Sequence, residues 1–244
     1  MPSLRDTISV FRIHLARLRG EAGPFLLAAL VFPTVMYFFA NAIKGDAHGD
    51  QNRFRFLAGS IVFSLSLTAI SWLGYLLLEN RFTGRLKLFA TLPLTPSSYV
   101  FGILIFGVAQ SILGSGALLL VARLLGARTQ LGVLPLIATI LLTMLCLSGI
   151  SVIIATRARS FSEGSLLTDS LGAGLVFLAP VYYSPEDMPH ALRSVSEWLP
   201  TARAAHAVQA ALAGNYATRD LAILGVMGIL SLSLGFKLMR FREN

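Results

Sequence analysis

The sequence predicts an all-α integral membrane protein with six transmembrane helices. Hydrophobic residues make up 55% of the 244 residues and charged residues only 13%, and the mean hydropathy is +0.71. A soluble domain of this length would find such a composition hard to keep in solution. The charged residues are also gathered so that long stretches lack Asp, Glu, Lys and Arg altogether. These stretches are residues 23–43, 56–78, 88–122, 129–156, 170–185 and 221–236.

The first four stretches are long enough to cross a membrane, since a spanning helix needs about 20 apolar residues. The last two, residues 170–185 and 221–236, are shorter and reach only about 24 Å at a rise of about 1.5 Å per residue. We therefore expect flanking residues, a thinner bilayer or neighbouring protein to complete the fifth and sixth spans.

Both termini are expected to be cytoplasmic, because this orientation places the larger share of the 20 basic residues on the inner side of the membrane. The basic N-terminal region and the apolar run after it could also be a signal peptide. That run is too long, since the apolar core of a signal peptide spans roughly 7 to 15 residues. We therefore expect it to remain as the first span.

An amphipathic helix is predicted ahead of the first span, within residues 1–20. Its apolar residues recur at spacings of three and four, so they share one helical face. They are Leu4, Ile8, Phe11, Leu15 and Leu18. Arg5, Arg12 and Arg19 flank this face, which is typical of a helix that lies in the headgroup plane. The alternative is a solvated helix packed on a partner protein.

A second amphipathic helix is predicted between the second and third spans, within the cytoplasmic residues 79–96. Phe82, Leu86 and Phe89 share one helical face, and two prolines, Pro93 and Pro96, end the helix before the third span. Apolar anchors at positions i, i+4 and i+7 are those that a helix uses to bind in a groove of another protein. We therefore expect this segment to dock on a partner.

Small residues in the third and fourth spans indicate close helix packing rather than chemistry. Gly107, Ser111 and Ser115 recur every four residues, which lets another helix approach closely. The single cysteine, Cys146, lies in the fourth stretch and is expected to be a packing residue. No disulfide can form within the chain.

Two motifs resemble ABC transporter permeases of the type-2 export family. The segment from Glu79 to Thr95, with Gly84 and then Thr-Leu-Pro-Leu-Thr at residues 91–95, is similar to the coupling-helix region of that family. Residues 180–189, Pro-Val-Tyr-Tyr-Ser-Pro-Glu-Asp-Met-Pro, followed by Leu-Pro-Thr at 199–201, are similar to its external segment between the fifth and sixth spans. With the span count and the N-terminal helix, the resemblance covers residues 1–244 as a single transmembrane domain.

The resemblance implies that residues 79–96 form a coupling helix, which receives force from a cytoplasmic ATPase. It assigns eight residues to this coupling: Glu79, Arg81, Phe82, Gly84, Arg85, Leu86, Lys87 and Phe89. Members of the family often carry Gly-Thr-Leu-Glu where this chain has Gly-Arg-Leu-Lys at residues 84–87. The charge pairing with the ATPase at Lys87 is therefore expected to differ.

The resemblance also implies that residues 184–214 fold back into the membrane as short re-entrant helices on the external side. Irregular backbone at membrane depth must be covered by protein or line a water-filled cavity, so we expect this segment to cap the outer end of a transport path. The alternative is an ordinary external loop with two surface helices. The residues assigned to the segment are Pro180, Tyr182, Tyr183, Pro185, Pro189 and Pro200. Members often have Asn-Pro where this chain has Leu-Pro at residues 199–200.

The partners implied by the resemblance are two copies of a cytoplasmic ABC ATPase, a second permease copy in a homodimer or heterodimer, and the lipids of the cytoplasmic (inner) membrane. The sequence contains no Gly-x-x-x-x-Gly-Lys-Ser/Thr loop, so we expect ATP and Mg to bind to the ATPase and not to this chain. No nucleic acid is expected, because the basic residues fall where the topology places them. The expected role is export of a hydrophobic or amphipathic substrate, such as a drug, lipid, peptide or glycolipid.

Few residues within the spans point to chemistry. Asn41, Gln110 and Phe106 are candidate contacts in a pore or between helices, and Asp169 is interpreted as an interfacial anchor. The four histidines are scattered and predict no metal site. Two other functions stay open: a non-transport assembly factor that docks an ATPase, and a membrane-embedded lipid-modifying enzyme.

Overall fold

The computed structural model is mainly helical in the residues that it describes, which are 4–17, 23, 31–44, 49–85, 95–127, 129–183, 186 and 188–238. No strand occurs in these ranges, so the predicted all-α class is confirmed. The helices are α1 (Leu4–Arg17), α3 (Phe32–Lys44), α4 (Gly49–Ser66), η3 (Leu67–Trp72), α5 (Leu73–Phe82), α7 (Pro96–Leu124), α8 (Val133–Arg157), α9 (Phe161–Phe177), α10 (His190–Ser196), α11 (Pro200–Leu212) and α12 (Thr218–Leu238).

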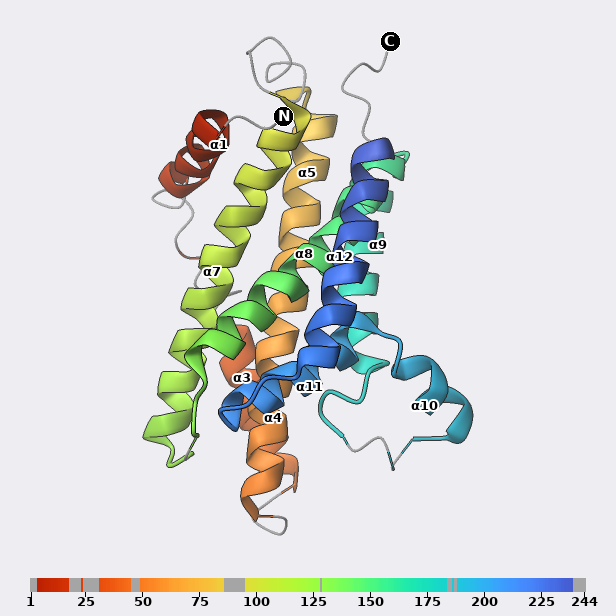
Figure 1. Ribbon diagram of the computed structural model, residues 1–244. Helices are drawn as coiled ribbons and strands as arrows, with labels where there is room; N and C mark the ends of the chain where they lie inside the picture. The colour runs from red at the N-terminus through yellow and green to blue at the C-terminus, as the bar shows by residue number, and fades with distance from the viewer. Residues whose placement is uncertain are drawn as a thin grey trace.

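Four of the described helices are long and apolar enough to cross a membrane. They are Phe54–Phe82, which runs through α4, η3 and α5 without a break, Ser97–Leu124, Val133–Arg157 and Thr218–Leu238. These helices match the second, third, fourth and sixth predicted spans. Figure 1 shows them in one bundle, with α8 inclined across its neighbours.

The predicted first and fifth spans are shorter helices in the structure. α3 has 13 residues, and much of the N-terminal part of the predicted stretch, residues 24–30, lies outside the described residues. α9 has 17 residues, so it begins before the predicted stretch 170–185 and ends within it. The start of this helix was predicted too late, because Glu163 and Asp169 interrupt the apolar run. Both residues nevertheless belong to α9. The expected flanking residues therefore join the fifth span on its N-terminal side.

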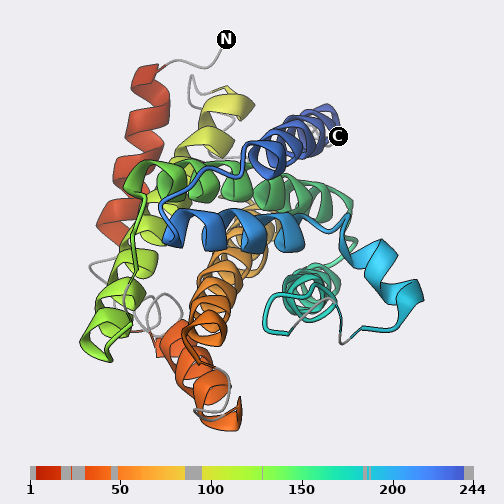
Figure 2. The ribbon, with the colours of Figure 1, turned by 60° about the horizontal axis from the view of Figure 1, so that its bottom comes forward.

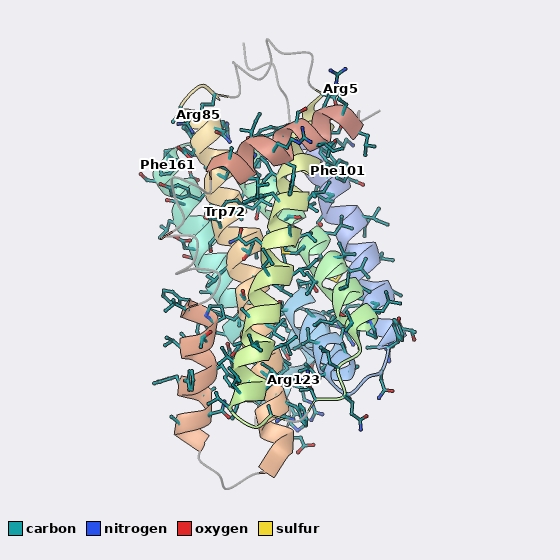
Figure 3. The ribbon with its side chains drawn as sticks, turned by 90° about the vertical axis from the view of Figure 1, so that its left-hand side faces the viewer. Arg5, Trp72, Arg85, Phe101, Arg123 and Phe161 are labelled. Atoms are coloured by element: carbon teal, nitrogen blue, oxygen red, sulfur yellow. The ribbon has the colours of Figure 1, made fainter. Side chains whose placement is uncertain are left out.

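The bundle has two ends, which we call the Arg85 end and the Arg123 end after the residues labelled in Figure 3. The end of α5, the beginning of α7 and the end of α12 lie at the Arg85 end, with α1 beside them (Figure 1). The end of α7 lies at the Arg123 end together with α11. The predicted topology places the N-terminal helix, residues 79–96 and the C-terminus on the same side of the membrane, so it requires these segments to lie at one end of the bundle.

The N-terminal helix α1 packs against the third span through a face that the sequence does not single out. Thr7, Val10 and His14 are buried, and a Cβ on Gly102 of α7 would lie only 2.6 Å from Val10 Cβ. The predicted apolar stripe instead points largely outward, since Leu4 is 77% exposed. The inner face of α1 therefore packs on the chain itself, and the outward stripe is left for lipid or for a partner protein, which are the two predicted alternatives.

Hydroxyl groups fasten neighbouring helices to a π-helical turn, η3, in the middle of the second span. A π turn widens the helix and disturbs the regular hydrogen bonds of its backbone. Ser151 of α8 donates a hydrogen bond to the carbonyl of Ala69 in this turn, and Ser66 donates to the carbonyl of Gly172 in α9 at 2.8 Å. These bonds hold α8 and α9 on the second span.

Small residues allow close packing at two places in the bundle. A Cβ on Gly107 would lie 3.0 Å from the Met144 side chain, and Ser111 donates to Met144 Sδ at 3.3 Å, which confirms the predicted packing face. A tighter seam joins α8 to α12, where a Cβ on Gly149 would lie 2.7 Å from the α12 backbone. Cys146 is buried on α8 as a free thiol, as its predicted packing role requires.

Candidate functional site

The second span ends at the beginning of the predicted coupling segment. Thr83 caps the last turn of α5, donating from its N–H at 2.9 Å and from its hydroxyl at 2.6 Å to the carbonyl of Glu79. Gly84 then adopts a left-handed conformation with φ +76°, which favours glycine and terminates the helix. Phe82 therefore belongs to α5, whereas Leu86 and Phe89, which were predicted to share its helical face, lie outside the described residues.

Of the eight predicted coupling residues, the structure describes the five that precede residue 86. Leu86, Lys87 and Phe89 lie outside the described residues, as does Pro93. Glu79 and Arg85 form an ion pair with an Oε1–Nη1 distance of 3.2 Å. Phe82 is 40% exposed at the end of α5.

Arg81 contacts the end of another span. Its Nη1 donates to the carbonyl of Ala155 at 2.7 Å and to that of Ala158 at 3.0 Å. Both carbonyls lie at the C-terminal end of α8, where helix carbonyls lack partners within the helix and the helix dipole is negative. The guanidinium therefore caps α8 from α5. The sequence assigned Arg81 to coupling without indicating this contact.

A buried polar contact joins α5 to the next span along the chain. Asn80 Nδ2 donates to the hydroxyl of Tyr99 at 2.6 Å, and both side chains are buried. Thr95 caps α7 by accepting a hydrogen bond from the N–H of Ser98 at 3.3 Å, and Pro96 occupies the first turn. The predicted apolar stretch began at residue 88, whereas α7 begins at Pro96, one of the two prolines predicted to end the preceding helix. The Asn80–Tyr99 bond was not predicted.

The turn from α8 to α9 is fixed by a capping box. The hydroxyl of Ser160 accepts from the N–H of Glu163 at 3.1 Å, and the Glu163 carboxylate accepts from the N–H of Arg159 at 2.9 Å. This reciprocal pairing satisfies two N–H groups at the start of α9. The Ser-x-x-Glu pattern was visible in the sequence and could have revealed it.

The predicted external segment contains one buried helix and one surface helix. α11 is buried along most of its length, at Pro200, Thr201, Ala202, Ala204, Ala205, Ala207, Val208, Ala211 and Leu212. Figure 2 shows it alongside α8, with α10 at the side of the bundle. The alternative of two surface helices is therefore wrong for α11. On α10 and just after it, Leu192, Val195 and Trp198 are exposed.

The residues of the predicted external segment that come before α10 fold the chain back over the end of α9. Pro180 is buried, and the Tyr183 hydroxyl donates to the carbonyl of Phe177 at 2.8 Å. The Tyr182 ring covers Gly59 of α4, where a Cβ would lie 2.8 Å from the ring. Pro189 stands at the exposed N-cap position of α10, whereas Pro185 lies outside the described residues.

Backbone hydrogen bonds tie α11 to the loop between α7 and α8. The N–H of Gly132 donates to the carbonyl of Ala211 at 2.8 Å, and the N–H of Gln130 donates to that of Leu212 at 3.1 Å. Leu212 is the last residue of α11, so its carbonyl would otherwise lack a helical partner. The Arg123 end is therefore closed by α11 and this loop together.

The three candidate pore residues are not brought together. Asn41 donates to the carbonyl of Tyr37 at 2.7 Å within α3. Phe106 is buried beneath α1, with its ring centroid 5.3 Å from that of Trp72. Gln110 is buried in α7, and its Oε1 has no hydrogen-bond partner among the described residues.

Asp169 lies on the exposed face of α9. This face also carries Leu166, which is 69% exposed, together with the exposed Ser170 and Phe177. A carboxylate is costly where a span faces lipid. The face therefore combines apolar side chains with a group that needs water or protein beside it.

One comparison with known proteins gives a match. The sequence model of a family described as ABC-2 type transporter matches residues 8–213. The matched range begins within α1, includes the end of α5 and the α8–α9 turn, and ends directly after α11. No curated protein matches the chain.

Proposed function

Because this chain belongs to the ABC-2 type transporter family, we propose that it is the permease subunit of an ATP-driven exporter. The observation that carries the proposal is the family match, which covers both the segment after α5 and the buried helix α11. In this function, a cytoplasmic ATPase binds residues 79–96 and pushes on the Arg85 end. The spans then change which side of the membrane the transport path opens to.

The energy for transport comes from the partner subunits. The sequence has no phosphate-binding loop of the Walker type, so ATP and Mg bind to two copies of a separate ABC ATPase. The permease itself is not an enzyme. Its contribution is mechanical, and it depends on the contacts that join the end of α5 to the other spans.

The proposed topology has six spans, with both termini in the cytoplasm of a cell bounded by an inner membrane. α3 and α9 supply the first and fifth spans, each completed by flanking residues, in addition to the four longer helices. The grouping of α1, the α5–α7 connection and the end of α12 at one end of the bundle supports this topology (Figure 1). The Arg85 end is then the cytoplasmic end.

A second permease copy completes the transport path. The exposed face of α9 combines Leu166 and Phe177 with Ser170 and Asp169, and such a mixture suits a partly hydrated interface better than lipid. Two copies that face one another there would enclose a path with apolar and polar walls. A hydrophobic or amphipathic substrate, such as a drug, lipid, peptide or glycolipid, fits this lining.

Reconstitution tests the proposal. The chain alone, in lipid nanodiscs, should show no ATP hydrolysis, whereas the complex isolated through this chain from its native membrane should contain an ABC ATPase and hydrolyse ATP. Cysteines that replace His48 or Asp187 should react with an impermeant reagent in intact cells. ATP hydrolysis by the chain alone, or labelling only after lysis, would contradict the proposal. Hydrolysis by the complex with no movement of any substrate would favour a docking factor instead.

A further inference from the structure

The last turns of α5 hold three other spans through residues that are close together in sequence. Asn80 binds Tyr99 at the start of α7, and Arg81 binds the end of α8. Leu78 packs against Gly164 at the start of α9, where a Cβ would lie 2.4 Å from Leu78 Cδ2. The side chains that project in different directions from one short stretch of helix thus reach α7, α8 and α9. Figure 3 shows Arg85, which directly follows this stretch, and Phe161 of α9 at the same end of the molecule.

Arg81 makes the contact that most depends on its chemistry. Its Nη1 lies 2.7 Å from the Ala155 carbonyl and 3.0 Å from the Ala158 carbonyl, and both acceptors sit at the negative end of the α8 dipole. A guanidinium always carries its charge and presents several donors in a rigid plane. One side chain of α5 therefore fixes the last turn of α8.

The α8–α9 turn carries that attachment onward to the fifth span. The Ser160–Glu163 capping box locks the two or three residues that follow α8, and Leu78 packs directly on the first turns of α9. The end of α8, the turn and the beginning of α9 are therefore held as one body against α5. A movement of α5 can reach α9, whose outer face carries Asp169, without a separate contact from the ATPase.

We propose that Arg81 is a positioning residue that transmits movement of the end of α5 to α8 and α9, rather than a docking contact with the ATPase. The proposal rests on the proposed function, since the movement originates in the ATPase. It assigns docking to the exposed Phe82 and the residues after Gly84, and transmission to the buried side of α5. A merely structural cap on α8 would stabilise the bundle without changing how movement passes through it.

The test is made in the whole complex and measures two movements separately. The input is the movement of the end of α5, and the output is the movement of the start of α9. The native cysteine is first removed by Cys146→Ala. One variant then carries spin-labelled cysteines at Thr83 and Gln130 for the input, and a second carries them at Ser162 and Gln130 for the output. All three positions are exposed. Distances are compared with and without trapped nucleotide in nanodiscs. In the otherwise unchanged chain, both distances should shift when the ATPases close.

The decisive variant is Arg81→Met, which keeps the length of the side chain but loses the charge and the donors. It should bind as much ATPase as the unchanged chain and keep the input shift, while the output shift falls roughly fivefold or more. Arg81→Lys should keep part of the output shift, because an ammonium is a point charge that can donate to both carbonyls. Arg157→Met is the matched control: it removes a charge from the exposed side of the same helix end and should leave both shifts unchanged.

Each other outcome is informative. An unchanged output shift in Arg81→Met would overturn the proposal, and so would loss of ATPase binding in Arg81→Met with normal binding in Arg157→Met, since Arg81 would then be a docking contact. If Arg81→Met does not fold, as judged by size-exclusion chromatography, Arg81→Gln carries the test, because it loses the charge and is too short to bridge both carbonyls, and a full output shift in that variant would overturn the proposal. Absence of an ATPase from the unchanged complex would instead refute the proposed function itself.

Discussion

The two ends of the helix bundle are held together by different kinds of contact. At the Arg85 end, single side chains reach from α5 to its neighbours, as Arg81 does to α8 and Asn80 does to Tyr99. At the Arg123 end, a whole helix is buried, and the N–H of Gly132 binds the carbonyl of Ala211 in that helix. The first end adds polar side-chain links to a packed apolar cluster that includes Leu78, Val100 and Ala155, whereas the second end is closed by hydrogen bonds to the backbone of a buried helix.

This difference fits the work that each end would do in the proposed exporter. Separate links let a movement of α5 be divided among several spans, and each link can be removed without dismantling the others. A buried helix with backbone hydrogen bonds resists local change, because small shifts in a close-packed core disturb many contacts at once. Substitutions at the Arg85 end should therefore alter coupling, and substitutions at the Arg123 end should alter stability.

The largest expected effect is on ATPase binding. Replacement of Phe82, Leu86 and Phe89 by Asp places charges where the docking segment should meet the ATPase, and the loss of three apolar anchors should cost about 4 kcal/mol or more. That corresponds to a roughly thousandfold weaker complex, measured by the amount of ATPase that co-purifies. The matched control replaces the exposed Leu192, Val195 and Trp198 at α10 with Asp, and it should leave the ATPase bound. Equal binding by both triple variants would argue against docking at the Arg85 end.

The next effect concerns the stability of the Arg123 end. Ala205 of α11 is 0% exposed, so Ala205→Leu inserts methylene groups where no space exists and should cost about 3 kcal/mol. Thermal unfolding in detergent should show a lower midpoint, while ATPase binding per folded molecule is unchanged. Ala213→Leu, at the exposed position after α11, should unfold like the original chain. If Ala205→Leu were just as stable, α11 would not be the packed element described.

The sequence was enough to predict the second, third and fourth spans, whose apolar runs are long and uncharged, and the sixth, whose run is shorter. It was less successful for α9, because an apolar-run criterion excludes Glu163 and Asp169, although Ser160 and Glu163 together mark the helix start. A helix boundary at an interface is set by capping groups, and apolar content alone does not reveal them. The start of the third span was predictable because Pro96 is itself the boundary signal.

The contacts of the candidate site were less predictable, because they join residues far apart in the sequence. Arg81 and Ala155 are separated by 74 positions, and nothing in their local sequence indicates the pairing. The helix break at Gly84 was open to prediction from the glycine, but the predicted helical face that begins at Phe82 did not take this break into account. The burial of α11 depends on alanines that pack tightly, and alanine-rich sequence does not by itself distinguish a buried helix from an exposed one.

A moderate effect is expected at the link between α5 and α7. Tyr99→Phe removes the acceptor of the Asn80 amide at a buried site, and an unsatisfied buried donor should cost about 2 kcal/mol. Asn80→Leu combined with Tyr99→Phe removes both polar partners, so the double variant should recover much of the loss. Thermal unfolding of the single and double variants measures this coupling. Additive losses would show that the bond does not hold the two helices together.

The smallest effect is expected from the ion pair between Glu79 and Arg85. The two charged groups lie 3.2 Å apart, but the Arg85 side chain is 51% exposed, so water and salt weaken their attraction. Glu79→Gln should therefore change the unfolding free energy by less than about 1 kcal/mol, with a smaller difference at high salt. Because the pair lies beside the docking segment, the same variant should alter the salt dependence of ATPase binding more than it alters stability. A loss of stability as large as that of Tyr99→Phe would mean that the exposed ion pair holds the Arg85 end as firmly as the buried Asn80–Tyr99 bond, and the expected order of these links would be wrong.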